Sequence, residues 1–277
     1  EIAQLVVVGI IVGSIIGLGG IGLTLTYGVM KFANFAHGDL MSLGMFFALF
    51  VLADVGLDGG RIGPLSFGWG MVAAILFAMA GIALLALAID RLVFRPLRSR
   101  GSDIITMAIA SLGLGIMIRA GVQLIWGSSP ERYGGGINRA TTIFWDLKVK
   151  PDQFFIVGLT LVLVVLIFLL LYRTKLGTAM RATADNPGLA EASGIDTERI
   201  RQWTWVIAGG LIAVAGVMLA LQAQLRFDAG FNLILPMFAA VILGGIGNPW
   251  GALVGGLVVG ISQEVSVHWI DSGLKPG

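Results

Sequence analysis

The chain has 277 residues, of which 57% are hydrophobic and only 12% are charged, and its formal net charge is +2. Soluble domains carry about 25% charged residues, so this composition excludes a water-soluble fold and indicates a surface that faces lipid. The lack of cysteine and the wide separation of His37 and His268 exclude a disulfide framework and argue against a metal site. The small, scattered positive charge argues against nucleic acid as a partner.

Apolar stretches long enough to cross a membrane follow one another along the chain. A hydrocarbon core about 30 Å thick needs about 20 apolar residues in an α-helix. The clearest stretch, Phe154 to Tyr172, contains no charged residue. The other predicted spans cover residues 2–27, 70–89, 104–126, 203–225, 232–247 and 251–270. We therefore predict an all-α fold, a polytopic transmembrane helix bundle that forms a single domain over residues 1–277.

The stretch from residue 28 to residue 52 differs because its first third is polar. It contains Lys31, Asn34, His37 and Asp39, and a charge at the bilayer centre costs about 2.5 to 3.5 kcal/mol. This third cannot face lipid at mid-depth, so we expect it near an interface or along a watery cavity. Counted as a span with an irregular start, it brings the total to about eight.

Lysine and arginine predict the orientation of the bundle. If the connections 95–103 and 173–202 share one side, ten of the 18 basic residues lie there, which favours that side as cytoplasmic and places both termini outside. In the loop 173–202, Asn186 suits a helix N-cap, Pro187 the first helical position and Gly194 the left-handed residue after the end.

The helix predicted in this loop has about two turns and would be unstable alone in water. Nothing else predicted on that side is large enough to pack against it. We therefore expect a partner protein to hold it, and an ordinary connecting turn is the alternative.

A second interruption is predicted late in the chain, where glycines are frequent and Pro249 prevents a smooth helix. Interrupted spans near opposite ends of a transporter point to its transport path, while close helix packing is the alternative, most of all for Gly255 and Gly256. The predicted substrate path comprises Asn34, His37, Gly38, Asp39, Gly244, Gly245 and Gly247.

Ionisable residues inside the spans admit simpler roles. His37 and Asp39 could form a proton relay, but we expect them to cap broken helix ends or to reach headgroup water. Arg119 lies about two turns inside its span, where we expect it to snorkel or to pair with a backbone carbonyl. The sequence has no phosphate-binding G-x-x-x-x-G-K-[ST] motif, no G-x-S-x-G and no H-E-x-x-H, so we predict neither an enzyme nor an energy-transducing site.

Three stretches resemble the permease subunits of the high-affinity branched-chain amino acid ABC importers. They are Tyr27-Gly28 with Asn34-Phe35-Ala36-His37-Gly38, then Arg181-Ala182 with Ala190-Glu191-Ala192-Ser193-Gly194-Ile195, and finally the run from Ala239 to Ala252. The resemblance covers nearly the whole chain. Ser193 is a departure, because the family usually has leucine before that glycine.

The resemblance implies a complex in a prokaryotic plasma membrane. A second, related permease subunit would pair with this chain, two cytoplasmic ATPase subunits would dock on the coupling loop 173–202, and an extracytoplasmic binding protein would deliver substrate to the outward loops 53–68 and 127–153. This chain would hold no cofactor, and ATP and Mg would bind to the ATPases. The implied ATPase coupling residues are Asn186, Pro187, Leu189, Ala190, Glu191, Ala192 and Gly194.

Three alternatives stay open at this point. Related permeases carry urea or short amides, so the cargo could be of that class. A self-sufficient channel or ion-coupled carrier could use His37, Asp39 and Arg119. An intramembrane enzyme is more distant, because no nucleophile and base stand out together.

Overall fold

The computed structural model describes residues 2–57, 59–60, 62–133, 141–142 and 148–269. Within these residues each predicted span contains a helix, although residues 31–36, 223–225 and 245–247 of these spans are not helical. The helices are α1 (Ile2–Met30), α2 (His37–Leu49), α3 (Gly70–Ile89), α4 (Arg95–Ser99), α5 (Ile104–Trp126), α6 (Pro151–Arg173), α7 (Lys175–Asp185), α8 (Pro187–Ala192), α9 (Thr197–Gln222), α10 (Ala229–Gly244) and α11 (Pro249–Ser266). Two π-helical turns, η1 (Phe50–Asp54) and η2 (Asp90–Phe94), extend α2 and join α3 to α4.

Six helical segments in the described part of the chain are long and apolar enough to cross a membrane, and they confirm the polytopic bundle. They are Ile2–Met30, His37–Asp54, Gly70–Ser99, Ile104–Trp126, Pro151–Arg173 and Thr197–Gln222. The last two predicted spans are the shorter helices α10 and α11. The 16 residues of α10 span about 24 Å, less than the hydrocarbon core.

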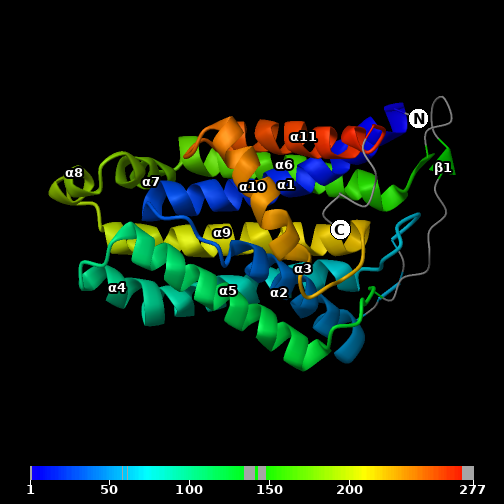
Figure 1. The fold of residues 1–277 in the computed structure, drawn as a ribbon, viewed down its shortest axis with the longest axis horizontal. Helices are drawn as coiled ribbons and strands as arrows, with labels where there is room; N and C mark the ends of the chain where they lie inside the picture. Colours follow the sequence, from blue (N-terminus) through cyan, green and yellow to red (C-terminus); the bar gives the residue numbers. More distant parts are fainter. Residues whose placement is uncertain (1, 58, 61, 134–140, 143–147, 270–277) are drawn as a thin grey trace.

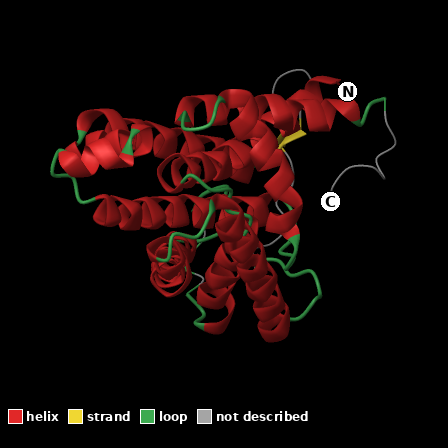
Figure 2. Ribbon diagram, turned by 60° about the vertical axis from the view of Figure 1, so that its left-hand side comes forward, coloured by secondary structure: helices red, strands yellow, loops and turns green. Residues whose placement is uncertain are grey.

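The helices form two groups on either side of α9 (Figure 1). One group contains α1, α6 and α11, and the other contains α2, α3 and α5, while α7 and α8 project from one end. The short strands β1 (Thr141–Thr142) and β2 (Lys148–Val149) pair antiparallel at the opposite end, beside the N-terminus (Figure 2).

Burial separates the central helices from the outer ones. In their most apolar windows, 78% of the residues of α9 and 67% of those of α1 are buried, against 22% for α5. All three are strongly apolar, so the difference lies in packing: the rest of the chain covers α9 and α1 and leaves much of the apolar surface of α5 uncovered. The centre of the bundle is therefore built by α1, α2 and α9.

Glycines allow α1 and α11 to lie in direct backbone contact. A Cβ added to Gly9 would lie 2.6 Å from the Cα of Ile261, and one added to Gly13 would lie 2.8 Å from the carbonyl oxygen of Gly256. A Cβ on Gly255 would overlap the carbonyl oxygen of Ala240. The packing alternative is thus the correct one for Gly255 and Gly256.

The structure places the two basic connections on one side, as the orientation argument required. Arg98 at the end of α4 forms an ion pair with Glu198 at the start of α9, and Lys31 reaches Ala184 at the end of α7. We call this side, which carries α7 and α8, the coupling end. The start of α1 and the ends of α9 and α11 lie at the opposite end.

Candidate functional site

The chain between α1 and α2 turns back into the bundle. Lys31 has a positive φ of 62°, and its Nζ donates to the carbonyl oxygen of Ala184 at 2.5 Å. Residues 32–36 then run inward without helical structure. The backbone N–H of Phe35 donates to Oγ of Ser111 on α5 at 2.9 Å, because outside a helix it needs a partner from another element. The interruption predicted near the start of the chain is therefore present.

His37 and Asp39, at the start of α2, take separate partners. Nε2 of His37 lies 3.0 Å from the carbonyl oxygen of Gly19, in the middle of α1. Asp39 accepts hydrogen bonds from Nε and Nη2 of Arg119 at 2.8 and 3.2 Å. The expectation that Arg119 snorkels or binds a carbonyl is wrong. Of the two roles expected for Asp39, to cap a broken helix end or to reach headgroup water, the second is wrong because its side chain is 2% exposed. Each finds its counter-charge inside the protein, which desolvation demands.

The first turn of α10 meets the first turn of α2 inside the bundle. The carbonyl oxygen of Gly38 faces Gly230 so closely that a Cβ on Gly230 would overlap it. The N–H of Gly230 donates to Oγ of Ser42 at 2.9 Å, which satisfies one of the donors that a helix start leaves unpaired. We call Gly38, Asp39, Ser42, Arg119 and Gly230 the helix junction.

An aromatic contact closes the helix junction. The guanidinium carbon of Arg119 lies 3.7 Å from the centre of the Phe231 ring on α10, within the range of a cation–π interaction. Arg119 therefore ties α5 to both α2 and α10. Two helix starts, each with a partial positive charge, converge here with one carboxylate and one guanidinium between them.

Asn34 belongs to the predicted path residues of the early interruption, and the polar atoms of its side chain are unused. The residue is 1% exposed, and within the described chain neither Oδ1 nor Nδ2 has a hydrogen-bond partner. A buried amide without partners carries a desolvation penalty. Asn34 remains a predicted path residue, and its amide has unused hydrogen-bonding capacity.

The late glycines lie nearer the coupling end than the helix junction does. Gly244 ends α10 and packs directly on Gly251 of α11. Gly245 and Gly247 have φ of 88° and 87°, and the N–H of Gly247 donates to Oγ1 of Thr24 at 2.7 Å. Gly245 and Gly247 thus form a tight turn between two helices. The two predicted groups of path residues occupy different depths along α1 and do not form one cluster.

The coupling loop contains the helix that its capping residues predict. Oδ1 of Asn186 accepts from the N–H of Leu189 at 3.1 Å at the start of α8, and Gly194 has a φ of 84° after its end. The expectation that only a partner could hold this helix is wrong. A helix not predicted from the sequence, α7, packs against it, and Ala190 is 4% exposed. Leu189 is 64% exposed and remains available to a partner.

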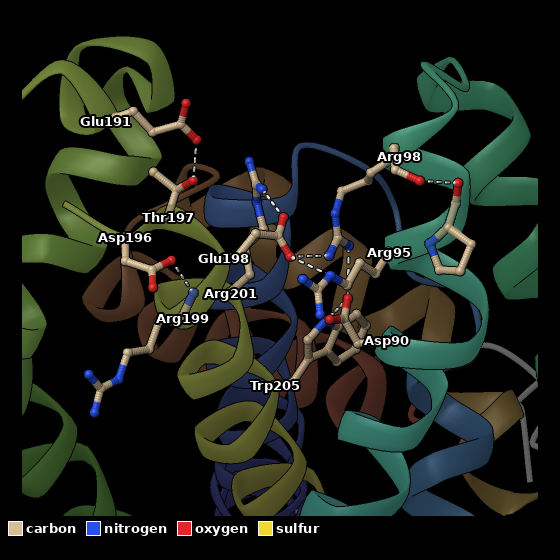
Figure 3. Close-up of polar contacts among 12 residues, drawn as sticks. Asp90, Arg95, Arg98, Glu191, Asp196, Thr197, Glu198, Arg199, Arg201 and Trp205 are labelled. Carbon is tan, nitrogen blue, oxygen red and sulfur yellow. Dashed lines mark hydrogen bonds and ion pairs between the residues drawn. The ribbon is translucent and has the colours of Figure 1, made fainter. Parts of the chain in front are cut away.

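Polar contacts connect α8 to the rest of the coupling end (Figure 3). Oγ1 of Thr197 donates to Oε1 of Glu191 at 2.5 Å, which links the end of α8 to the start of α9. One residue further, Glu198 forms ion pairs with Arg98 at 3.3 Å and with Arg201. A continuous series of hydrogen bonds and ion pairs therefore connects α8 through the start of α9 to α4.

Asp90, at the start of η2, is the buried centre of these contacts. Its side chain is 0% exposed, and its Oδ1 accepts from Nη1 of Arg98 at 2.8 Å and from Nε1 of Trp205 at 2.9 Å (Figure 3). We call Asp90, Arg98, Glu198 and Arg201 the ion cluster. Sequence reasoning missed it, because Asp90 follows an apolar span and looks like an interfacial charge. The two partners of Asp90, which are Arg98 and Trp205, lie 8 and 115 positions away in the sequence.

The described chain contains six apolar helical segments of membrane-spanning length, and two helix starts meet inside the bundle. This architecture defines a multi-pass membrane protein. The chain belongs to the family described as branched-chain amino acid transport system / permease component, which matches residues 5–275.

Relatives match over nearly the full length. The chain is 30% identical to the probable branched-chain amino acid transport permease protein LivH of Methanocaldococcus jannaschii, over 97% of this chain and 82% of that one. It is 29% identical to the high-affinity permease LivH of Escherichia coli K12, over 96% and 86%, and 31% identical to BraD of Pseudomonas aeruginosa, over 94% and 84%. No solved structure matches the chain. The family match and the membrane-spanning helices together identify the chain as a multi-pass permease of the inner membrane.

Proposed function

We propose that this chain is the membrane subunit of an importer for branched-chain and other hydrophobic amino acids, driven by ATP hydrolysis on partner subunits. The observation that carries the proposal is the family match over residues 5–275, together with relatives that are named for this transport. The chain contributes the passage and no catalysis of its own. A second permease, two ATPases and an extracytoplasmic binding protein complete the machine.

The geometry of the coupling end supports docking of an ATPase on α8. The helix presents Leu189 outward, while its cap at Asn186 and the Glu191–Thr197 hydrogen bond hold it to the bundle. A movement of α8 would therefore be transmitted to α9 through the hydrogen bond between Glu191 and Thr197. Of the predicted coupling residues, Ala190 is 4% exposed and cannot contact a partner directly. The proposed docking residues are therefore Asn186, Pro187, Leu189, Glu191, Ala192 and Gly194.

The helix junction supports a passage inside this chain. Helices that start at depth leave backbone donors and side chains inside the membrane, where they can meet a polar solute. We propose that Asn34, His37, Gly38 and Asp39 line the passage and that the turn with Gly244, Gly245 and Gly247 lies along its inner part.

The docking proposal is tested by replacing Leu189 with Glu in the full complex. We expect the ATPases to be lost on co-purification and ATP-dependent leucine uptake to be abolished, while the amount of inserted permease is unchanged. The matched control is Arg199→Glu. It changes an exposed charge in the first turn of α9, within the coupling loop 173–202 but outside α8. Normal uptake by Leu189→Glu would contradict the coupling role.

Two alternatives have direct tests. If urea or a short amide is the cargo, excess urea should inhibit the uptake of labelled leucine, and leucine uptake should not saturate as the leucine concentration rises. A self-sufficient carrier predicts flux in vesicles that contain the purified chain without ATPases. Under our proposal neither result is expected.

A further inference from the structure

A groove of about 430 Å³ lies at the coupling end, where α6 ends and α7 begins. Its walls include Tyr172, Arg173, Lys175 and Ile195. The apolar span that contains α6 ends at Arg173, so the groove lies where this span leaves the hydrocarbon core. This is the depth at which lipid headgroups are found.

The turn between the two helices holds the groove in shape. Thr174 alone separates α6 from α7. Its Oγ1 donates to the carbonyl oxygen of Leu170 at 2.5 Å and accepts from the N–H of Gly177 at 3.0 Å. A Cβ on Gly177 would overlap the carbonyl oxygen of Leu170, so α7 packs directly on the last turn of α6. The backbone of Arg173 and of Lys175 is therefore fixed on the two sides of this turn.

Two cations of the groove have no counter-charge in the chain. Arg173 and Lys175 are exposed, and in the part of the chain that the structure describes neither takes part in an ion pair. A third cation lies beside them: the guanidinium carbon of Arg181 is 4.8 Å from the centre of the Tyr172 ring. The groove thus concentrates positive charge at one place on the coupling end.

The other polar groups around the groove are already used. The hydroxyl groups of Thr174 and Thr178 donate to backbone carbonyl oxygens. No carboxylate from the described residues lines the groove, and Asp196, which follows the lining residue Ile195, caps the start of α9 through the N–H of Arg199. Recognition in the groove therefore depends on its cations, which favours an anion.

An apolar stripe leads from the middle of α6 to the groove. Val165, Leu169 and Tyr172 follow one another at i, i+4 and i+7, so they lie on one face of the helix. They are 50%, 44% and 45% exposed. A soluble anion or an acidic protein segment would match only the charges of the groove. A phospholipid with a net negative charge would match both the charges and the stripe.

We propose that the groove binds the headgroup of an anionic phospholipid. Arg173 and Lys175 bind the phosphate, since charge-assisted hydrogen bonds and the attraction between basic residues and anionic lipid both favour this pairing. The acyl chains lie along the stripe on α6. Because α7 packs against α8, the bound lipid would also fix α8 relative to the membrane surface. The inference goes beyond the proposed function and does not depend on the cargo.

The native chain has no cysteine, so Leu169→Cys can carry a fluorophore on the stripe. The assembled importer is placed in vesicles of equal parts phosphatidylcholine and phosphatidylglycerol, in which one lipid or the other has brominated acyl chains that quench a nearby fluorophore. We expect brominated phosphatidylglycerol to quench more strongly. The parent complex without the introduced cysteine gives the background. Leu166→Cys, 53% exposed on the same helix, is a second reporter if Leu169→Cys fails to assemble.

The matched control reporter is Ile109→Cys on α5. Ile109 is 65% exposed and lies five residues from the coupling end of its helix, as Leu169 lies four residues from the end of α6. The two reporters therefore have a similar depth, and we expect both lipids to quench equally at Ile109→Cys. The same preference for phosphatidylglycerol at both reporters would mean a general attraction to the coupling end and would overturn the site.

The cations are tested in the Leu169→Cys background. The ratio of the binding constants for the two lipids follows from the quenching. We expect Arg173→Gln and Lys175→Gln each to lower this ratio about fivefold, because a basic residue near an anionic surface contributes a factor of about this size. Arg91→Gln removes an exposed charge outside the groove and should leave the ratio unchanged.

Three results would overturn the lipid site. The first is equal quenching by the two lipids at Leu169→Cys. The second is no quenching by either, which would mean that protein covers the stripe. The third is an unchanged ratio in the two charge variants; if the double variant also loses the ATPases on co-purification, the groove belongs to the ATPase. None of these results bears on the proposed function, which leucine uptake tests separately.

Discussion

Gly38 and Gly230 face each other where α2 and α10 begin, and neither position has room for a Cβ. The two helix starts approach this closely because both residues lack a side chain. The contact sets how near the Asp39–Arg119 pair lies to α10. It is therefore the packing constraint on which the helix junction depends.

Gly230→Ala should destabilise the protein, because the added methyl group meets the carbonyl oxygen of Gly38. Overpacking typically costs about 1 to 3 kcal/mol, and backbone atoms cannot move aside as a side chain can. The measurement is thermal unfolding of the purified protein in detergent. Gly121→Ala is the control, since a Cβ there meets nothing within 4 Å. A Gly230→Ala protein as stable as this control would contradict the close contact.

Asp39 and Arg119 should show strong energetic coupling. Asp39→Asn leaves the guanidinium without its carboxylate inside the bundle, and breaking a buried pair costs about 3 to 5 kcal/mol. The exposed fraction of 21% for the Arg119 side chain places the expected loss at the lower end of that range. A double-mutant cycle with Arg119→Gln, read by thermal unfolding, should show that the double variant loses less than the sum of the single losses. Additive losses would count against the pair.

Within the ion cluster, burial should rank the effects of substitution. Asp90→Ala removes the acceptor of both Arg98 and Trp205 at a fully buried position, so we expect a loss of about 3 to 5 kcal/mol. Glu198 has a side chain that is 34% exposed, and solvent screening reduces the expected loss for Glu198→Ala to about 1 kcal/mol or less. Unfolding midpoints of the two variants test this order, and the reverse order would refute it.

The turn between α10 and α11 should depend on the left-handed backbone of Gly247. Its φ of 87° is strained for any residue with a Cβ, so Gly247→Ala should cost about 1 to 2 kcal/mol. Thr24→Val removes the hydroxyl that accepts from the N–H of Gly247 and should cost about 1 kcal/mol. Gly158→Ala in α6, where a Cβ meets nothing within 4 Å, controls for the measurement of stability in detergent. Two tolerated substitutions at Gly247 and Thr24 would show that the turn is not constrained.

The sequence alone predicted the spans, both interruptions and the caps of α8. These features depend on local terms: the transfer of apolar side chains to lipid sums along a segment, Pro249 removes a helical donor, and Asn186 caps the helix that follows it. The same reasoning missed α7, although its sequence is amphipathic and places Gly177, Met180 and Thr183 on one buried face.

Only the tertiary structure decided which polar groups meet. Arg119 pairs with Asp39 across 80 positions, and Trp205 donates to Asp90 across 115. An ionisable side chain inside a membrane requires a counter-charge. The residue type in the sequence is enough to show that such a partner is required. Which counter-charge it finds depends on which helices become neighbours, and that choice is made by contacts between small residues such as Gly38 and Gly230, whose partners no local pattern specifies.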